Sequence, residues 1–324
     1  MQTSREVILN TLTFNTPDRF GFDFPEPYGS DFWFMGMSPS PDNRPPSGNG
    51  TDEWGAVWEN IGASDIGEVK EFPLKSWDDF PRLRVPDIRD PRRFEGIRGA
   101  RQRVGDKFLL GWGISLYARA HYIRGLENTW CDIYTDPDKL GELLDILVGM
   151  NLYVIEQYAK EGFDGYIFCD DWGLQDRLMI SPEAWRTLWK PRYAKIFAKA
   201  QESGIRTFMH SCGHIVDILD DLIDIGLDVV HMDQQANMGL DLLGKRFGGR
   251  LTFFSPVDIQ TVLPKGDYAE IRAYARHMAR AFATRKGGFI PRWYTDPQGA
   301  GHSMDAVNVM CEEFLKISKE MYGH

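Results

Sequence analysis

Short apolar segments alternate with helix-like segments along most of the chain, and this alternation restricts the possible folds more than any other feature. Strands that are apolar throughout and separated by one helix indicate parallel β/α units buried on both faces. Helix-like spacing of apolar residues follows almost every apolar segment. The segments that we predict as strands are Phe20–Phe24, Phe108–Gly113, Gly165–Asp170, Ile205–His210, Leu227–His231, Arg250–Phe254 and Gly288–Pro291.

The number of β/α units favours a closed barrel. Two helix starts are marked by a capping residue and a proline, at Asp136-Pro137 and Ser181-Pro182. Seven or eight such units over about 300 residues fit a (β/α)8 TIM barrel, whereas an open sheet usually has about five or six strands. We expect the eighth strand between residues 61 and 86.

The segment at about 28–95 differs from the rest of the chain. It is rich in proline and glycine and contains four tryptophans, at positions 33, 54, 58 and 77. A long irregular segment in a compact protein is usually functional. We therefore predict a single barrel domain over residues 1–324, with an irregular N-terminal excursion that covers one end.

Composition excludes several classes of protein. Asp and Glu number 47 against 37 Lys and Arg, a formal charge of −10, which disfavours nucleic acid and anionic membranes as partners. Four cysteines in 324 residues do not form a disulfide framework. The N-terminus carries no secretory signal, and the apolar stretch Leu143–Ile155 is too short and polar to span a bilayer. We expect a cytoplasmic protein.

Polar residues follow the predicted strands, at the end where (β/α)8 barrels carry their active sites. We take as candidates the polar and aromatic residues just beyond these strand ends, together with one histidine that follows a glycine-rich loop. They are Asp170, Asp171, Trp172, His210, Cys212, Gln234, Asp258, Arg292, Trp293, Tyr294, Asp296 and His302.

His210 and Cys212 form the strongest pair among these candidates. Two positions apart on an extended segment, their side chains point the same way. Imidazole and thiolate together suit Zn²⁺, although a buried cysteine beside a capping histidine is an alternative. Of the neighbours Asp170 and Asp171, one should face the barrel mouth as a general acid or base while the other caps a turn. We expect Cys169 to face the outer helices.

Several short motifs occur in a distinctive order. They are Pro17-Asp18-Arg19, Arg124-Gly125, Asp170-Asp171-Trp172-Gly173, Ser181-Pro182-Glu183, Lys190-Pro191, His210-Ser211-Cys212-Gly213 and Gly287-Gly288-Phe289-Ile290-Pro291. This order resembles the uroporphyrinogen decarboxylase superfamily, and more closely its branch of cobamide-dependent and O-demethylase methyltransferases. The resemblance covers roughly residues 108–322.

The resemblance implies a barrel whose mouth holds zinc through the histidine and cysteine of His-x-Cys and a further cysteine after the last strand. His210 and Cys212 match the first two ligands. Residues 291–296 contain no cysteine, so another residue must complete the set. We take Asp296 as that ligand, with His302, Asp258 and Asp170 as alternatives.

The function implied by the resemblance is transfer of a methyl group between a small methylated donor, such as an aryl methyl ether, and the cobalt of a corrinoid. The chain lacks a corrinoid-binding Asp-x-His-x-x-Gly motif, so the corrinoid would arrive on a partner protein. A metal or a proton from Asp170, Asp171 or His302 would stabilise the leaving oxygen. Trp172, Trp293 and Tyr294 would flank the aromatic ring in the substrate-binding site. The resemblance also suggests a homodimer.

Two other functions remain open. One is a cofactor-free decarboxylase, whose small carboxylate substrate would be held by Arg119, Arg124 or Arg292. The superfamily's carboxylate-binding Arg-Gln-Ala-Gly-Arg segment has no counterpart near residues 18–28. The other is a non-catalytic barrel that binds a methylated small molecule.

Overall fold

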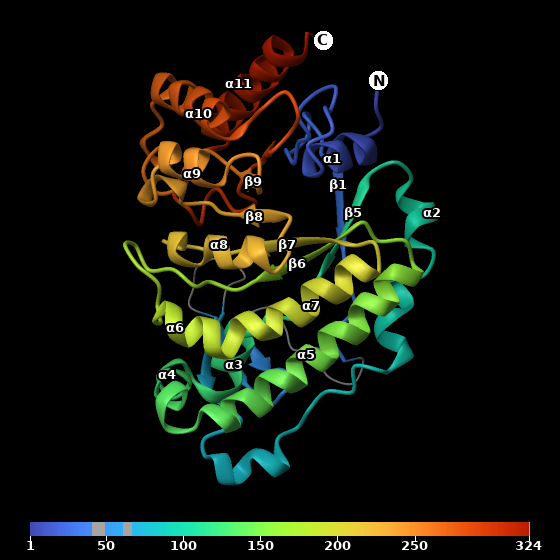
Figure 1. The fold of residues 1–324 in the computed structure, drawn as a ribbon, viewed down its shortest axis with the longest axis vertical. Coiled ribbons are helices and arrows are strands. Elements are labelled where there is room, and N and C mark those ends of the chain that lie inside the picture. Colours follow the sequence, from blue (N-terminus) through green and yellow to red (C-terminus); the bar gives the residue numbers. More distant parts are fainter. Residues whose placement is uncertain (41–48, 61–66, 324) are drawn as a thin grey trace.

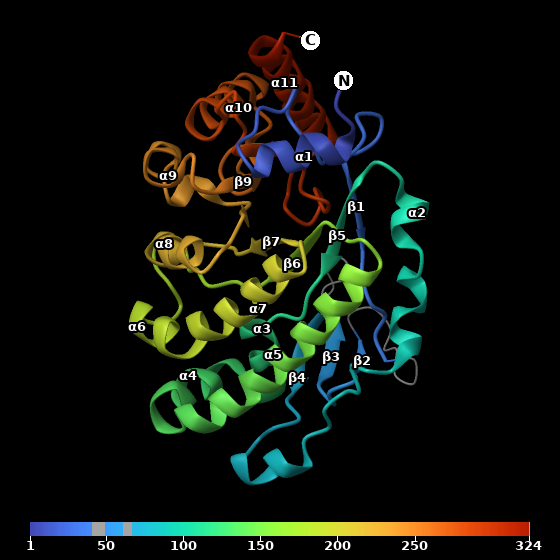
Figure 2. The same ribbon diagram turned by 45° about the vertical axis from the view of Figure 1, so that its right-hand side comes forward.

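The computed structural model describes residues 1–40, 49–60 and 67–323. Its main sheet has seven parallel strands that follow one another in chain order and curl into an open barrel wall (Figures 1 and 2). The strands are β1 (Phe32–Met35), β5 (Phe108–Trp112), β6 (Gly165–Cys169), β7 (Arg206–His210), β8 (Val229–His231), β9 (Thr252–Ser255) and β10 (Phe289–Pro291). Six of the seven predicted strands are therefore confirmed.

The first predicted strand is wrong, and the eighth is not found among the described residues. In Phe20–Phe24 only Asp23 pairs, through isolated bridges to Ser30 and to Arg292 beyond β10, and β1 takes the edge position instead. No eighth strand joins the main sheet within the described ranges. The described part of 61–86 contains β4 (Gly67–Glu71), which belongs to a separate antiparallel sheet with β2 (Gly50–Thr51) and β3 (Val57–Asn60). Residues 61–66 lie outside the described residues.

Helices cover the outer face of the main sheet, and α5 and α7 lie side by side across it (Figure 1). The α-helices are α1 (Ser4–Leu12), α2 (Ala100–Val104), α3 (Tyr117–Arg124), α4 (Leu126–Thr135), α5 (Pro137–Lys160), α6 (Pro182–Ala184), α7 (Lys190–Glu202), α8 (Val216–Asp224), α9 (Leu240–Phe247), α10 (Tyr268–Phe282) and α11 (Met304–Tyr322). The 3-10 helices are Trp77–Arg82, Pro91–Ile97, Gln235–Asn237 and Leu263–Lys265, and a π-helical turn, Trp185–Trp189, joins α6 to α7. In the described parts of the chain, no helix has the length and apolarity needed to cross a membrane.

The two faces of the main sheet pack into two separate apolar clusters, because successive side chains of a strand point to opposite faces. On β7, for example, Phe208 lies in the inner cluster and Met209 in the outer one. The outer cluster lies between strands and helices. The inner cluster fills the barrel interior with buried residues from the strands and from α1, namely Ile8, Leu12, Phe32, Phe108, Leu110, Ile167, Phe208, Val229, Phe254 and Ile290.

The small antiparallel sheet of the N-terminal excursion packs against α3. Asp52 forms an ion pair with Arg119 (3.0 Å) and accepts a hydrogen bond from the indole of Trp58 (3.2 Å). The Trp58 ring also contacts Tyr122 edge-on, with ring centroids 4.7 Å apart. Because α3 follows the carboxyl end of β5, these contacts fix the excursion near the end of the barrel where the strands finish.

Candidate active site

A layer of functional side chains lies directly above the inner cluster. Each of its members occurs two positions after an inner-cluster residue. Because residues two apart on a strand point to the same side, these side chains point into the barrel mouth. The layer comprises Phe34, Trp112, Cys169, His210, His231 and Arg292. The predicted placement of Cys169 is therefore wrong, since this cysteine is exposed and lies beside His210 in the register of β6 and β7.

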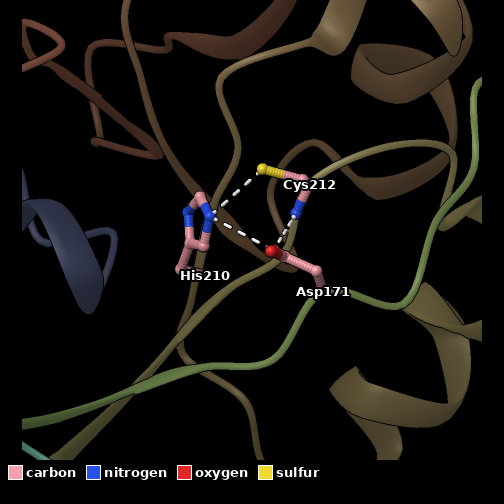
Figure 3. A group of neighbouring side chains, drawn as sticks. All are labelled: Asp171, His210 and Cys212. Carbon is pink, nitrogen blue, oxygen red and sulfur yellow. Dashed lines mark hydrogen bonds and ion pairs between the residues drawn. The ribbon is translucent and has the colours of Figure 1, made fainter. Parts of the chain in front are cut away.

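Three of the candidate side chains converge at the ends of β6 and β7 (Figure 3). His210 Nε2 lies 3.4 Å from Cys212 Sγ and 3.4 Å from Asp171 Oδ1. The Cys212 backbone N–H donates to the same Asp171 oxygen at 2.8 Å. One ligand atom from each of the three residues lies within 4.8 Å of the others, so Asp171, His210 and Cys212 form a possible metal site.

Two glycines allow the loops that carry these residues to cross at close range. Gly173 donates a backbone hydrogen bond to Cys212 O (3.2 Å), and Gly213 adopts a φ of +75°. A Cβ added to Gly173 would collide with the backbone of His214, and one added to Gly213 would collide with the backbone of Gly173. Glycine at both positions therefore holds Asp171 and Cys212 together.

Charge interactions bind His210 to its acidic neighbours. Burial opposes the charged form of both His210 and Asp171. Their mutual hydrogen bond nevertheless raises the pKa of His210 well above its usual value and lowers the pKa of Asp171. Burial raises the pKa of Cys212, and the hydrogen bond with His210 opposes this rise. Without a metal, the group is held by a hydrogen-bonded imidazolium and carboxylate.

A second polar group lies on the other side of the His210 ring. His210 Nδ1 is 3.2 Å from His231 Nδ1, and His231 Nε2 is 3.1 Å from Asp233 Oδ1. Arg292 Nη1 contacts His231 Nε2 and lies 3.8 Å from Asp233 Oδ1. Burial, followed by the positive charge of Arg292, lowers the pKa of His231 well below its usual value. His231 and Asp233 were not among the site residues predicted from the sequence, although His231 ends β8 and Asp233 follows it two positions later.

Asp170 lies outside the converging group. It is fully buried and accepts hydrogen bonds from the backbone N–H groups of Leu116 (2.9 Å) and Ala118 (2.8 Å). The Tyr193 hydroxyl donates to it at 2.5 Å. Both carboxylate oxygens are thus occupied in holding the start of α3, and of the two neighbouring aspartates it is Asp171 that faces the metal-site candidates.

Two further candidates also stabilise the fold. Trp172 is fully buried and stacks on Tyr117, with centroids 3.9 Å apart and planes 15° apart. Asp258 is buried and accepts backbone hydrogen bonds from Ala236 (3.2 Å) and Thr261 (2.7 Å). Neither residue is in a position to contact a molecule at the barrel mouth.

The remaining candidates lie around the group rather than in it. Gln234 Oε1 accepts a hydrogen bond from Gly213 N at 2.8 Å, which supports the loop of Cys212. Asp296 accepts from Gly299 N at 2.9 Å and is absent from the groups of possible ligands found in the described residues. Asp171, rather than the predicted Asp296, is therefore the third residue beside His210 and Cys212.

Two aromatic residues after β10 are half-buried, and a buried histidine lies next to one of them. Trp293 donates its backbone N–H to Asp23 O at 2.9 Å. Burial, followed by the negative charge of Asp233, raises the pKa of Tyr294. Its ring centroid lies 6.4 Å from that of His302. Burial lowers the pKa of His302.

Comparisons with known proteins agree on a family and a fold. The sequence profile described as Uroporphyrinogen decarboxylase (URO-D) matches residues 60–292. A uroporphyrinogen decarboxylase of Nocardia farcinica is 24% identical over 236 residues, which are 69% of this chain and 64% of that protein. One from Geobacillus kaustophilus is 28% identical over 183 residues, 53% of this chain and 51% of that protein. The matches thus span about half to two thirds of the length of these relatives.

A solved structure resembles the whole chain. The methyltransferase from Methanosarcina mazei superposes with a TM-score of 0.70 at 18% identity, and the match covers 98% of this chain and 99% of that one. The two proteins therefore share a fold from end to end.

Proposed function

The chain belongs to the uroporphyrinogen decarboxylase family, and within this family we propose that it is a zinc-assisted, corrinoid-dependent methyltransferase. It would take a methyl group from a small aryl methyl ether and pass it to the cobalt of a corrinoid carried by a partner protein. The observation that carries the proposal is the convergence of a carboxylate, an imidazole and a thiol at the ends of β6 and β7. Cationic anchors for a polycarboxylate, which a porphyrinogen would need, have no equivalent in this group.

The spacing of the three side chains fits zinc. Two ligands on a tetrahedral zinc ion, at the usual zinc–nitrogen and zinc–sulfur lengths, lie about 3.5 Å apart. His210 Nε2 lies 3.4 Å from both Cys212 Sγ and Asp171 Oδ1. A nitrogen, a sulfur and an oxygen form an ordinary zinc donor set, with one position left for a substrate. We therefore assign Asp171, His210 and Cys212 as the residues that would hold the ion.

When bound there, zinc would act as a Lewis acid toward the ether oxygen of the donor. As the carbon–oxygen bond breaks, the methyl carbon bonds to the acceptor, and the leaving oxygen keeps the bonding electrons and gains a proton. Tyr294, with its raised pKa, keeps its phenolic proton at neutral pH and can donate a hydrogen bond to that oxygen. The leaving oxygen would take its proton from water at the barrel mouth, since the lowered pKa of His302, the neighbour of Tyr294, leaves that imidazole neutral.

Two stacked aromatic residues on β1 and β5, on the β6 side of the barrel mouth, support an aryl donor. Phe34 and Trp112 stack with centroids 5.7 Å apart and planes 28° apart, and both lie in the layer at the barrel mouth. Trp112 is 45% exposed, whereas Leu110, two positions earlier on the same strand, is fully buried. An exposed indole at the mouth offers a face on which an aromatic ring can stack. These two residues take the role that the sequence analysis gave to Trp172.

Decarboxylation of a small carboxylate is the second candidate, because the curated relatives are decarboxylases. Two of the three arginines expected to hold the carboxylate are engaged elsewhere. Arg119 pairs with Asp52 at 3.0 Å, and Arg124 is buried with Asp132 at 2.8 Å. Arg292 lies at the mouth but contacts His231. The arrangement therefore favours methyl transfer.

Metal analysis combined with a methyl-transfer assay tests the proposal. We expect about one zinc per wild-type chain, loss of the metal in His210→Ala and Cys212→Ala, and formation of methylcobalamin from cob(I)alamin and aryl methyl ethers. Cys131→Ala is the matched control, since Cys131 is an exposed thiol on α4 that belongs to neither group of possible metal ligands in the described residues. A protein that stays metal-free in excess zinc would exclude the zinc-assisted route. Release of carbon dioxide from aryl carboxylates without methyl transfer would favour the decarboxylase.

A further inference from the structure

The two ring nitrogens of His210 face different surroundings. Nε2 points to Cys212 and Asp171, which we assigned above as its companions in holding zinc. Nδ1 points to His231 Nδ1 at 3.2 Å, and that ring continues to Asp233 Oδ1 at 3.1 Å. His231 is only 8% exposed and Asp233 only 2% exposed, so protein groups rather than water satisfy this side of His210.

The second side could itself hold a metal, since one ligand atom each from His210, His231 and Asp233 lies within 4.8 Å of the others. Arg292 argues against this role. Its guanidinium contacts His231 Nε2, lies 3.8 Å from Asp233 Oδ1 and packs over the Phe254 ring at 5.0 Å. A fixed positive charge at the centre of a buried group repels a second cation. The group is therefore available for hydrogen bonding.

We propose that His231 and Asp233 are positioning residues that orient His210 with its Nε2 lone pair toward Cys212 and Asp171. In this arrangement His210 Nδ1–H donates to His231 Nδ1, and His231 Nε2–H donates to Asp233 Oδ1. The guanidinium of Arg292, beside His231 Nε2, can only donate, so it and His231 Nε2–H are both directed at Asp233, and the chain of hydrogen bonds ends on that shared carboxylate. The inference deepens the proposed function, because it concerns the same candidate zinc site.

The physical effect is on metal affinity. A histidine ligand binds metal only through a nitrogen that carries no proton, so a partner that keeps the proton on Nδ1 keeps Nε2 available. The same hydrogen bond stops rotation of the ring about its Cβ–Cγ bond. Loss of such a partner typically weakens metal binding about 10- to 100-fold.

Zinc affinity and the cobalt spectrum of the full-length protein test the proposal. Zn²⁺ is titrated against a chromophoric chelator in wild type, His231→Phe and Asp233→Asn. His231→Phe keeps an aromatic ring but removes the nitrogen that accepts the hydrogen bond from His210. Asp233→Asn keeps the shape of the side chain but removes its negative charge. We expect about 10- to 100-fold weaker Zn²⁺ binding in both variants. At saturation, the spectrum of the Co²⁺-loaded protein should be unchanged, because the ligands are the same.

A matched pair elsewhere serves as the control. His277 Nε2 lies 2.6 Å from Asp241 on the surface between α10 and α9, so His277→Phe and Asp241→Asn remove the same chemistry away from the mouth. These variants should bind Zn²⁺ like wild type. Unchanged affinity in His231→Phe and Asp233→Asn would overturn the positioning role while leaving the zinc site intact. A changed Co²⁺ spectrum would also overturn it, by making His231 a ligand.

A metal-free measurement separates this inference from the zinc proposal. In protein labelled with ¹⁵N-histidine, the Nδ1–H of His210 should give a protected ring N–H resonance that is absent in His231→Phe. A wild-type His210 without a proton on Nδ1 would refute the hydrogen-bond order. If wild type binds no zinc but shows this resonance, the zinc assignment fails and the His210–His231 hydrogen bond stands.

Discussion

The crossing of the two glycine loops gives a prediction that can be worked out in energy terms. Gly213 combines a φ of +75° with contact against the backbone of Gly173. An L-residue at positive φ costs about 1–2 kcal/mol, and forcing extra atoms into a packed site costs about 1–3 kcal/mol. We therefore expect Gly213→Ala to lower the free energy of unfolding by about 2–5 kcal/mol.

This loss converts to a measurable shift in melting temperature. The entropy of unfolding is about 2.1 cal/mol/K per residue, so a chain of 324 residues melts about 1.5 °C lower for each kcal/mol lost. Gly213→Ala should melt about 3–7 °C lower than wild type in differential scanning calorimetry. It should also bind Zn²⁺ more weakly, because Cys212 must move with the loop.

Substitutions at two other glycines separate the cost of the positive φ from the cost of the backbone collision. Gly204 has a φ of +71° and no neighbouring atom within 4 Å of an added Cβ, so Gly204→Ala measures the cost of the backbone angle alone. Gly173→Ala measures the collision alone, because a Cβ there meets backbone without a positive φ. The reasoning is refuted if Gly213→Ala and Gly204→Ala shift the melting temperature equally, or if Gly173→Ala leaves both melting and Zn²⁺ binding unchanged.

Three more predictions concern single side chains. Trp172→Ala should lower the free energy of unfolding by about 3–5 kcal/mol in denaturant titrations, because Trp172 is a fully buried core residue; a raised KM with unchanged stability would contradict this placement. Trp112→Ala should raise the KM for an aryl donor about 2- to 10-fold without changing zinc content, through lost stacking; an unchanged KM would remove Trp112 from the donor site. Burial lowers the pKa of His121 from 6.5 to about 4, so the unfolded chain takes up a proton that the folded chain excludes. The free energy of unfolding of wild type should then fall by up to about 3 kcal/mol relative to that of His121→Gln as pH falls from 6.5 to 4. Parallel curves of unfolding free energy against pH for the two proteins would contradict this prediction.

The pattern of apolar segments predicted the sheet well, except at its N-terminal edge. Phe20–Phe24 has the composition of a strand, yet only Asp23 pairs, whereas Phe32–Met35 forms β1. Composition indicates that a segment is suited to extended structure. It does not indicate which neighbouring strand has backbone N–H and C=O groups available for pairing with it. The choice between these two segments depends on tertiary contacts, which the sequence alone does not reveal.

The candidate site could be predicted in part for a similar reason. His210 ends β7 and Cys212 lies two positions later, so their common direction was predictable from the two-residue period of an extended chain. The choice between Asp170 and Asp171 was not, because β6 is apolar on both faces and shows no alternation that would identify its inner side. The same ambiguity misplaced Cys169. The partnership of His210 with His231 depends on the register of β7 against β8, which only the structure supplies.

The apolar cluster beneath the site has a consequence for the order of events during turnover. Phe208, Phe254 and Ile290 close the barrel interior, with Ile8 of α1 below them. In the proposed reaction a methyl donor and its acceptor would therefore enter from the same end, and displacement at the methyl carbon would require them to face each other in line. In the proposed reaction the donor would bind deeper, with its leaving oxygen toward His210. We therefore expect compulsory-order kinetics in which the acceptor protein follows the donor, and in which excess acceptor inhibits by closing the entrance first.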